Sequence, residues 1–287
     1  CLCMTDAISA VPAPTVVLLT DFGLTDPYVG QMKGVLHTLA PQAMIMDLSH
    51  GVPAYRVETV AFFLGSTYRF FPPGAVFVAV VDPWVGTDRD ILILSGGGYT
   101  FVGPDNGILI LALETLESLG EKDPRVWRLK SLPAAYAQET GLTFAGRDVM
   151  APLAARLCQG VDPASEGVTV NPATLVRPIW ATPERVDKGI LTSVLHVDHF
   201  GNAILNLANR TWLELVSGGD IWLLISSAGA QAALQLKLVP TYAELPPGKA
   251  GLVAGGQGYL ELAMCRASAA AELRLKAGDL IHLGLGG

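Results

Sequence analysis

An aspartate and an arginine stand seven residues apart on either side of a predicted turn, Asp82 after one apolar run and Arg89 before another. Pro83 and Gly86 between them favour a tight turn that brings the two charges together at the end of a buried strand. A carboxylate placed beside a guanidinium can accept a hydrogen bond from water and increase its nucleophilic character. The pair is therefore a candidate reacting centre, although an ion pair that only stabilises the turn is the alternative.

A second carboxylate, Asp21, follows another short apolar run at residues 16–20. The next segment, residues 29–39, has apolar residues at helical spacing, so Asp21 stands in a loop between a strand and a helix. Ligands of open α/β sheets bind at the carboxyl ends of the strands, where a carboxylate can accept hydrogen bonds from hydroxyl groups. Asp21 is therefore a second candidate for a ligand site.

The first half of the chain alternates apolar strands with helices, which predicts a largely parallel sheet covered on both faces. Strands are predicted at residues 16–20, 44–48, 76–81, 91–94 and 99–102. Helices are predicted at residues 29–39, 57–70 and 149–157. Asp148 is a candidate capping residue of the last helix, and Arg147 is either functional or a solvated or ion-paired loop residue.

The second half of the chain differs from the first in its residue pattern and shows no regular alternation of strands and helices. Prolines interrupt residues 162–187, and short apolar runs separated by glycine-rich turns follow, which predicts a small β-barrel or sandwich. Strands are predicted at residues 189–197, 203–207, 221–225, 232–238, 259–264 and 280–283. We place an α/β domain at residues 12–170 and a β domain at residues 185–287.

Composition narrows the possible partners of this 287-residue chain. A net charge of -7 and the absence of basic clusters argue against nucleic acid. The four cysteines are scattered without Cys-x-x-Cys spacing, which favours a reducing compartment and a cytoplasmic location. We expect no membrane span, no leader segment and no metal site, and the glycine-rich motifs that grip nucleotides are absent from the sequence.

Five short motifs, taken in order, resemble the S-adenosylmethionine hydroxide adenosyltransferases, which are relatives of the fluorinase and chlorinase. The motifs lie at residues 20–23, 81–89, 103–107, 146–148 and 198–202. The resemblance implies an amino-terminal Rossmann-like domain with a mostly parallel sheet and a smaller carboxy-terminal β-barrel-like domain. It also implies a homotrimer whose active sites lie between the first domain of one subunit and the second domain of its neighbour.

The reaction implied by this resemblance is cleavage of S-adenosylmethionine at ribose C5′ by a water-derived nucleophile, without a cofactor. Asp82 and Arg89 match two of the three residues that orient this water. The third is a His, and Ala145 stands in its place. Either the enzyme is impaired, or another group such as His50 or a water replaces the His. Because Arg89 would keep Asp82 ionised, we expect the pair to orient water rather than remove its proton outright.

The resemblance also assigns substrate contacts in the first domain. Asp21 would hold the ribose hydroxyls, Tyr55 would lie against the nucleoside, and Gly146 would line the substrate site. Two departures affect the shape of the pocket: Trp84 replaces a small residue, and Cys265 replaces an Asn.

In the second domain, the resemblance places the adenine against Phe200 and Asn202. Asp198 and the turn at Gly256 and Gln257 would approach the amino and carboxylate groups of the methionine part. By themselves these two turns are weak signals, because such residues also occur in ordinary turns.

Two functions remain open at this point besides the hydrolase. The chain could bind S-adenosylmethionine or adenosine without turnover, as Ala145 and Trp84 suggest. Halide transfer is a third option, but the halide-using relatives carry Tyr at position 82 and a hydroxyl side chain at position 85, where this chain has Asp82 and Val85.

Overall fold

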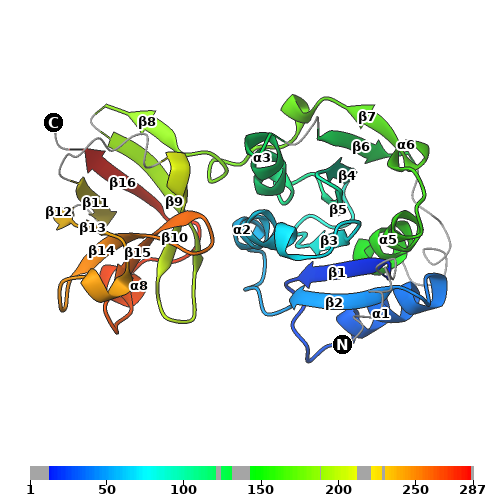
Figure 1. Cartoon of the computed structure of the whole chain (residues 1–287), viewed down its shortest axis with the longest axis horizontal. Coiled ribbons are helices and arrows are strands. Elements are labelled where there is room, and N and C mark those ends of the chain that lie inside the picture. The colour runs from blue at the N-terminus through cyan, green and yellow to red at the C-terminus, as the bar shows by residue number, and fades with distance from the viewer. Residues whose placement is uncertain are drawn as a thin grey trace, which may run out of the picture.

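The computed structural model describes residues 13–120, 124–130, 143–187, 189–211, 221–227 and 230–285. Figure 1 shows an α/β unit formed by the first half of the chain beside a β-rich unit formed by the second half. The predicted fold class is therefore confirmed. The outer limits predicted for the two domains, residues 12 and 287, lie outside the described residues.

The first sheet is mostly parallel. Its order is β2 (Met44–Ser49), β1 (Thr15–Thr20), β3 (Val76–Val80), β5 (Tyr99–Pro104), β4 (Ile91–Gly96), β6 (Arg125–Leu129) and β7 (Gly167–Val170). The first four strands in this order run parallel, whereas β4, β6 and β7 pair antiparallel with their neighbours. The hairpin of β4 and β5 turns at Gly97 and Gly98, which both have positive φ, as tight hairpins require.

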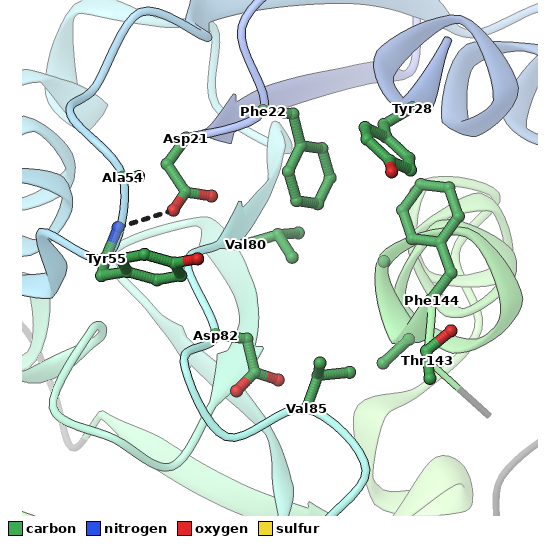
Figure 2. Close-up of a pocket in the computed structure, with 12 residues that line it drawn as sticks. Asp21, Phe22, Tyr28, Ala54, Tyr55, Val80, Asp82, Val85, Thr143 and Phe144 are labelled. Carbon is green, nitrogen blue, oxygen red and sulfur yellow. Dashed lines mark hydrogen bonds between the residues drawn. The ribbon is translucent and has the colours of Figure 1, made fainter. Parts of the chain in front are cut away.

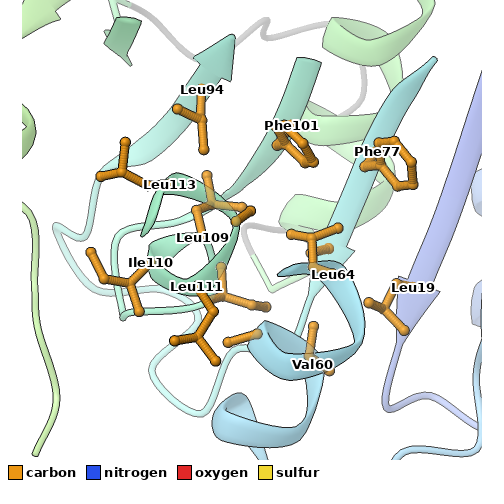
Figure 3. Close-up of a cluster of buried hydrophobic side chains, with 14 of the residues drawn as sticks. Leu19, Val60, Leu64, Phe77, Leu94, Phe101, Leu109, Ile110, Leu111 and Leu113 are labelled. Carbon is orange, nitrogen blue, oxygen red and sulfur yellow. The ribbon is translucent and has the colours of Figure 1, made fainter. Parts of the chain in front are cut away.

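Two hydrophobic cores lie on opposite faces of this sheet. Alternate residues of β1 divide between them: Val17 and Leu19 face the core under α2 (Val57–Thr67) and α3 (Ile110–Ser118). Figure 3 shows this core. Val16 and Leu18 of the same strand face the other core, under α1 (Tyr28–Leu39) and α5 (Ala151–Cys158). No described helix combines the length and apolar character that a membrane crossing needs.

Some elements differ from the prediction. Helix α3 and strands β6 and β7 were not predicted, and the helix predicted at residues 57–70 includes Tyr68–Phe70, which form a 3-10 helix. The capping role predicted for Asp148 is wrong, because helical structure already begins with a π-helix at Gly146–Met150. Asp148 is instead buried and paired with Arg147.

The second sheet is mostly antiparallel, and only its β13–β14 pair is parallel among the described pairings. Its order is β12 (Ala230–Leu236), β11 (Ile221–Ser227), β16 (Leu280–Leu285), β9 (Gly189–Val197), β10 (Ala203–Ala208), β15 (Tyr259–Met264), β14 (Ala250–Ala254) and β13 (Leu238–Val239), with β8 (Glu184–Val186) also on β9. Of two further short helices, α6 (Pro163–Glu166) lies beside β6 and β7 of the first sheet, and α8 (Ala269–Leu273) lies beside β15 of the second. The predicted strands of this half are present, β8 and β14 were missed, and the strand predicted at residues 232–238 joins β12 to the first residue of the separate strand β13.

Helix α2 of the α/β unit packs against the β-rich unit. The hydroxyl of Thr59 donates a 2.8 Å hydrogen bond to the backbone carbonyl of Leu195 on β9. The ring of Phe62 stacks on His196 and meets the edge of Tyr259, with centroids 6.1 and 5.4 Å apart. The β-rich unit therefore packs directly on a helix that covers the first sheet.

Candidate active site

A cavity of about 500 Å³ opens at the carboxyl ends of β1 and β3. It contains five residues that the sequence analysis selected: Asp21, Tyr55, Asp82, Ala145 and Gly146. Figure 2 shows that side chains from separate parts of the chain, among them Asp21, Tyr55 and Asp82, surround this cavity. The remaining lining residues are Phe22, Tyr28, Ala54, Val80, Val85, Thr143 and Phe144.

The predicted turn does bring Asp82 and Arg89 together. Arg89 Nη2 donates a hydrogen bond to Asp82 Oδ2, and the backbone N–H of Trp84 donates to Oδ1 at 3.1 Å. Gly86 has a φ of +88°, which is the left-handed region that glycine adopts without strain. The side chains of the pair are only 6% and 12% exposed, so the ion pair sits in a largely desolvated position beside the cavity.

Arg89 has more donors than the described residues can satisfy. Its Nε and Nη1 atoms are buried, and no hydrogen-bond partner for them occurs among the residues that the structure describes. A buried donor without a partner costs about 1–3 kcal/mol. Such a group in a folded protein needs an explanation, and a hydrogen-bond acceptor supplied by a ligand at the cavity is one that agrees with a functional role for this pair.

Burial determines the proton affinity of Asp82. Desolvation raises the pKa of this carboxyl above its ordinary value, and the nearby negative charge of Asp21 adds to the increase. The Arg89 guanidinium and the Trp84 hydrogen bond lower the pKa, but they do not outweigh burial. Arg89 thus lowers the pKa of Asp82 as expected, but burial outweighs it, and Asp82 is a better proton acceptor than an ordinary aspartate.

Tyr55 and Asp21 line one side of the cavity (Figure 2). The backbone N–H of Tyr55 donates a 2.9 Å hydrogen bond to Asp21 Oδ2, and burial raises the pKa of Asp21. Tyr55 has a φ of +68°, a conformation that costs a non-glycine residue about 1–2 kcal/mol. Its side chain is 70% exposed, so its ring is free to lie against a ligand.

Three aromatic rings form another part of the cavity wall. Phe22, Tyr28 and Phe144 contact one another with centroids 5.4 to 5.6 Å apart. The sequence analysis did not select these residues, although Phe22 follows Asp21 directly and Phe144 precedes Ala145. For Phe22 and Phe144, this position beside a selected residue was the available signal, whereas Tyr28 had none of this kind.

Ala145 lines the cavity, but the His50 side chain does not replace the missing imidazole. His50 is 4% exposed and is absent from the described cavity wall. Its Nδ1 lies 2.8 Å from Thr20 Oγ1, and its Nε2 lies 3.0 Å from Asp47 Oδ1. The structure therefore disfavours His50 as the third orienting residue.

Arg147 is an ion-paired residue rather than a free cation. Its guanidinium contacts the buried Asp148 at 2.6 Å and donates to Gln31 Oε1 at 2.8 Å. It also lies over the Phe144 ring, 5.0 Å from the centroid. These contacts hold the segment that carries Ala145, in agreement with the ion-paired alternative for Arg147.

The five residues predicted in the second half line a different cavity, of about 730 Å³, on the β-rich unit. They are Asp198, Phe200, Asn202, Gly256 and Gln257. Six other lining residues were not predicted: Tyr242, Glu261, Met264, Arg266, Ala267 and Ser268. Within one chain, the predicted substrate contacts are thus divided between two separate cavities.

Asp198 organises its own turn. Its Oδ1 accepts hydrogen bonds from the backbone N–H groups of Phe200 and Asn202 at 2.9 and 2.8 Å, and its Oδ2 accepts from Asn202 Nδ2 at 2.9 Å. Gly201 is required in this turn, because a Cβ atom there would overlap the Ser268 side chain. The turn leaves Phe200 77% exposed at the cavity.

The two residues that differ from the family pattern, Trp84 and Cys265, are not among the described residues that line either cavity. Trp84 is 59% exposed, and Cys265 is partly buried between the lining residues Met264 and Arg266. Among the described residues, no group of three or more His, Cys, Asp or Glu side chains is arranged to hold a metal ion.

Known proteins resemble this chain over nearly its whole length. The sequence models of the SAM (S-adenosylmethionine) hydroxide adenosyltransferase N-terminal and C-terminal domains match residues 16–167 and 192–282. The chain is 37% identical over 270 residues to the (R)-S-adenosyl-L-methionine hydrolase of Thermus thermophilus, covering 93% of this chain and 98% of that protein. It is 30% identical to a fluorinase from Actinoplanes sp., covering 92% and 95%. A solved structure of an uncharacterised conserved protein from Thermotoga maritima matches with a TM-score of 0.77 and 28% identity, covering 94% and 99%.

Proposed function

We propose a function from the premise that this chain belongs to the S-adenosylmethionine hydroxide adenosyltransferase family, as its motifs indicated. The chain is a hydrolase that cleaves S-adenosylmethionine at ribose C5′ and releases adenosine and L-methionine. The observation that carries this proposal is the desolvated Asp82–Arg89 pair at the cavity where the strands end.

The chemistry requires positioning more than acid catalysis, because the sulfonium sulfur is already a good leaving group. A water oxygen attacks C5′ in line with the C–S bond, and the electron pair of that bond goes to sulfur. Asp82 accepts a hydrogen bond from this water and receives its proton, which its raised pKa favours. Arg89 steadies the oxygen as negative charge develops on it.

The rest of the first cavity suits a nucleoside. Asp21 accepts hydrogen bonds from the ribose hydroxyls, and the exposed Tyr55 ring lies against the nucleoside. The aromatic rings of Phe22, Tyr28 and Phe144 shield the opposite side from water. A low local dielectric strengthens the electrostatic interactions on which the reaction depends.

A complete site then forms between subunits of a homotrimer. The first cavity of one chain meets the second cavity of its neighbour, where Phe200 and Asn202 contact the adenine, and Asp198, Gly256 and Gln257 approach the methionine part. The division of the candidate residues between two cavities supports this arrangement. So does the exposure of three aromatic side chains, which are Tyr55, Trp84 and Phe200.

The functional units extend over residues 12–170 and 185–287, and the reaction proceeds without an added cofactor. A cytoplasmic location remains a prediction from cysteine spacing. The test is incubation with S-adenosylmethionine, followed by chromatographic measurement of adenosine and methionine in equal amounts. Chloride is added in a parallel sample, in which 5′-chloro-5′-deoxyadenosine would instead indicate halide transfer.

One second function has a specific observation in its favour. Ala145 lines the cavity without a titratable side chain, so the chain could hold its ligand without turning it over. Tight binding of S-adenosylmethionine without any release of adenosine would identify this binding function.

A further inference from the structure

His50, directly after β2, is a buried imidazole that the proposed reaction leaves unused. Its Nδ1 atom lies 2.8 Å from the hydroxyl oxygen of Thr20, the last residue of β1. Its Nε2 atom lies 3.0 Å from Asp47 Oδ1 on β2. The imidazole therefore joins the carboxyl ends of two adjacent parallel strands, beside the point where the first cavity opens.

Asp47 determines which imidazole nitrogen carries the proton. Lys33 Nζ donates a 2.7 Å hydrogen bond to Asp47 Oδ2. Burial tends to raise the pKa of Asp47, but Lys33 and His50 lower it overall, so the carboxylate is charged at neutral pH. Its contact with His50 is electrostatic rather than a well-directed hydrogen bond, because Oδ1 lies off the direction of an Nε2–H bond. A negative charge at this position still attracts the imidazole proton to Nε2.

Thr20 supports the same position of the proton. Its side chain is fully buried, so its hydroxyl needs an acceptor inside the protein, and His50 Nδ1 is the acceptor within reach in the described part of the chain. With the proton on Nε2, Nδ1 has a lone pair to accept this bond. The Thr20 oxygen in turn accepts a 3.2 Å hydrogen bond from the backbone N–H of Phe22. The hydroxyl is thus held in one orientation.

These bonds act on the segment that follows Asp21. The N–H of Phe22 is bound to the Thr20 hydroxyl, and the N–H of Gly23 donates a 2.8 Å hydrogen bond to the backbone carbonyl of His50. The two peptide groups after Asp21 are therefore both held, one through the His50 side chain and one through its main chain.

The orientation of the Asp21 carboxylate depends on this backbone. Among the described residues, Asp21 has no hydrogen bond to another side chain, and Oδ2 accepts its bond from the backbone N–H of Tyr55, drawn as the dashed line in Figure 2. A binding group is effective only when its supporting residues hold it to within about 0.5 Å of the productive position. For Asp21, that support comes from the loop itself.

We propose that His50 is a positioning residue of the nucleoside site. Through the Thr20 hydroxyl and its own carbonyl, it holds the loop so that Asp21 can receive the ribose hydroxyls, and it thereby sets the preference for a ribonucleoside. The imidazole is absent from the described cavity wall, so it acts without touching the ligand. This inference rests on the proposed function, because it takes the first cavity as the nucleoside half of the site.

The test compares adenosine with 2′,3′-dideoxyadenosine, which lacks both hydroxyls. Each is titrated calorimetrically into the full chain. We expect the unmodified chain to bind adenosine at least about tenfold more tightly, as hydrogen bonds to a charged carboxylate imply. His50→Gln can keep an N–H near Asp47 but has no acceptor in the place of Nδ1. It should therefore lose most of this preference, while its affinity for dideoxyadenosine changes little.

Variants at Thr20 separate positioning from a general loss of structure. Thr20→Val removes the hydroxyl from a side chain of the same shape and should lose the preference as His50→Gln does. Thr20→Ser keeps the hydroxyl and should retain the preference. His37→Gln changes an exposed His on α1 and is the matched control. Binding of dideoxyadenosine shows that a variant is folded, and if one of the two positions does not tolerate replacement, the other decides.

The inference is overturned if the unmodified chain binds both nucleosides equally well, or if a folded His50→Gln or Thr20→Val variant retains the preference. Equal weakening of both nucleosides, with no difference between Thr20→Val and Thr20→Ser, would also overturn it, because that result indicates a purely structural role. Turnover of S-adenosylmethionine alongside any of these results would leave the proposed function standing. A chain that prefers adenosine through Thr20 and His50 but releases none from S-adenosylmethionine would contradict the proposed function and support this inference.

Discussion

Asp82 has a proton affinity set by two opposing effects. Burial raises its pKa, and the ion pair with Arg89 limits the increase. Burial therefore makes this carboxylate a better proton acceptor than an exposed aspartate, within the limit that the Arg89 guanidinium sets. The Arg89 guanidinium thus limits how far burial raises the pKa of Asp82.

Replacing Asp82 by Asn tests the role of the carboxylate with little change in shape. We expect turnover of S-adenosylmethionine to fall at least about 100-fold, since a positioned base contributes about 10²- to 10⁴-fold. Adenosine affinity should change by less than tenfold, about 1.4 kcal/mol. Asp88→Asn, in the same loop but exposed, is the matched control. Equal losses of turnover and adenosine binding would make Asp82 a structural residue.

The pH dependence of kcat/KM should report the raised pKa of Asp82. The ionised carboxylate is the active form, so activity falls as pH decreases through this pKa. That decline should lie above the ordinary aspartate value of about 3.9. Because Arg89 lowers the pKa, Arg89→Gln should move the decline to higher pH. A shift to lower pH would contradict the electrostatic account.

Position 145 tests the third orienting residue. Ala145→His should increase the rate of adenosine release, by up to the 10²- to 10⁴-fold that is typical of a positioned base. Ala145→Leu, of similar bulk but without a proton acceptor, should not. If both variants leave the rate unchanged, the group that assists water lies elsewhere in the cavity.

At the scale of elements, the strand ends explain which part of the site the sequence could predict. Asp21 and Asp82 each follow a short apolar run, so their location was readable from local sequence. Glu261 and Tyr242 are 19 residues apart and meet only through the fold of the second sheet. Nothing local distinguishes Glu261 from the alternating pattern of its strand. The antiparallel strands β6 and β7 were missed for a similar reason, because their pairing is non-local.

Two helical glycines provide a matched prediction about packing. A Cβ atom at Gly65 on α2 would lie 2.8 Å from the carbonyl oxygen of Leu111 on α3, so Gly65→Ala should destabilise the fold by about 1–3 kcal/mol. Gly34 on α1 has no atom within 4 Å of that position, so Gly34→Ala should stabilise by about 0.5–1 kcal/mol. Urea unfolding measures both. A neutral Gly65→Ala would mean that α2 and α3 can separate without cost.

At the scale of the whole molecule, the candidate residues of one chain lie in two separate cavities, which we propose to be two halves of a shared site. The Gly-rich turn and the Asp198 turn lie on the β-rich unit, whereas the reacting pair lies on the α/β unit. The proposed homotrimer joins these halves across subunits. Light scattering during gel filtration should give three times the mass of one chain.

Mixed subunits test whether the site is shared. Asp82→Asn removes the reacting carboxylate, and Phe200→Ala removes the predicted adenine contact. Each variant alone should be poorly active. After joint refolding or coexpression, random assembly should restore about a quarter of the sites, because each site takes one half from each of two neighbours. No recovery in demonstrably mixed trimers would place both halves within one chain.

The most direct test of the central claim is the fate of oxygen during turnover in water enriched in ¹⁸O. If water beside Asp82 and Arg89 attacks C5′, adenosine should gain one ¹⁸O atom at its 5′ position, methionine should gain none, and Asp82→Asn should form labelled adenosine far more slowly. Adenosine without the label, or labelled adenosine formed equally fast by Asp82→Asn, would contradict the account.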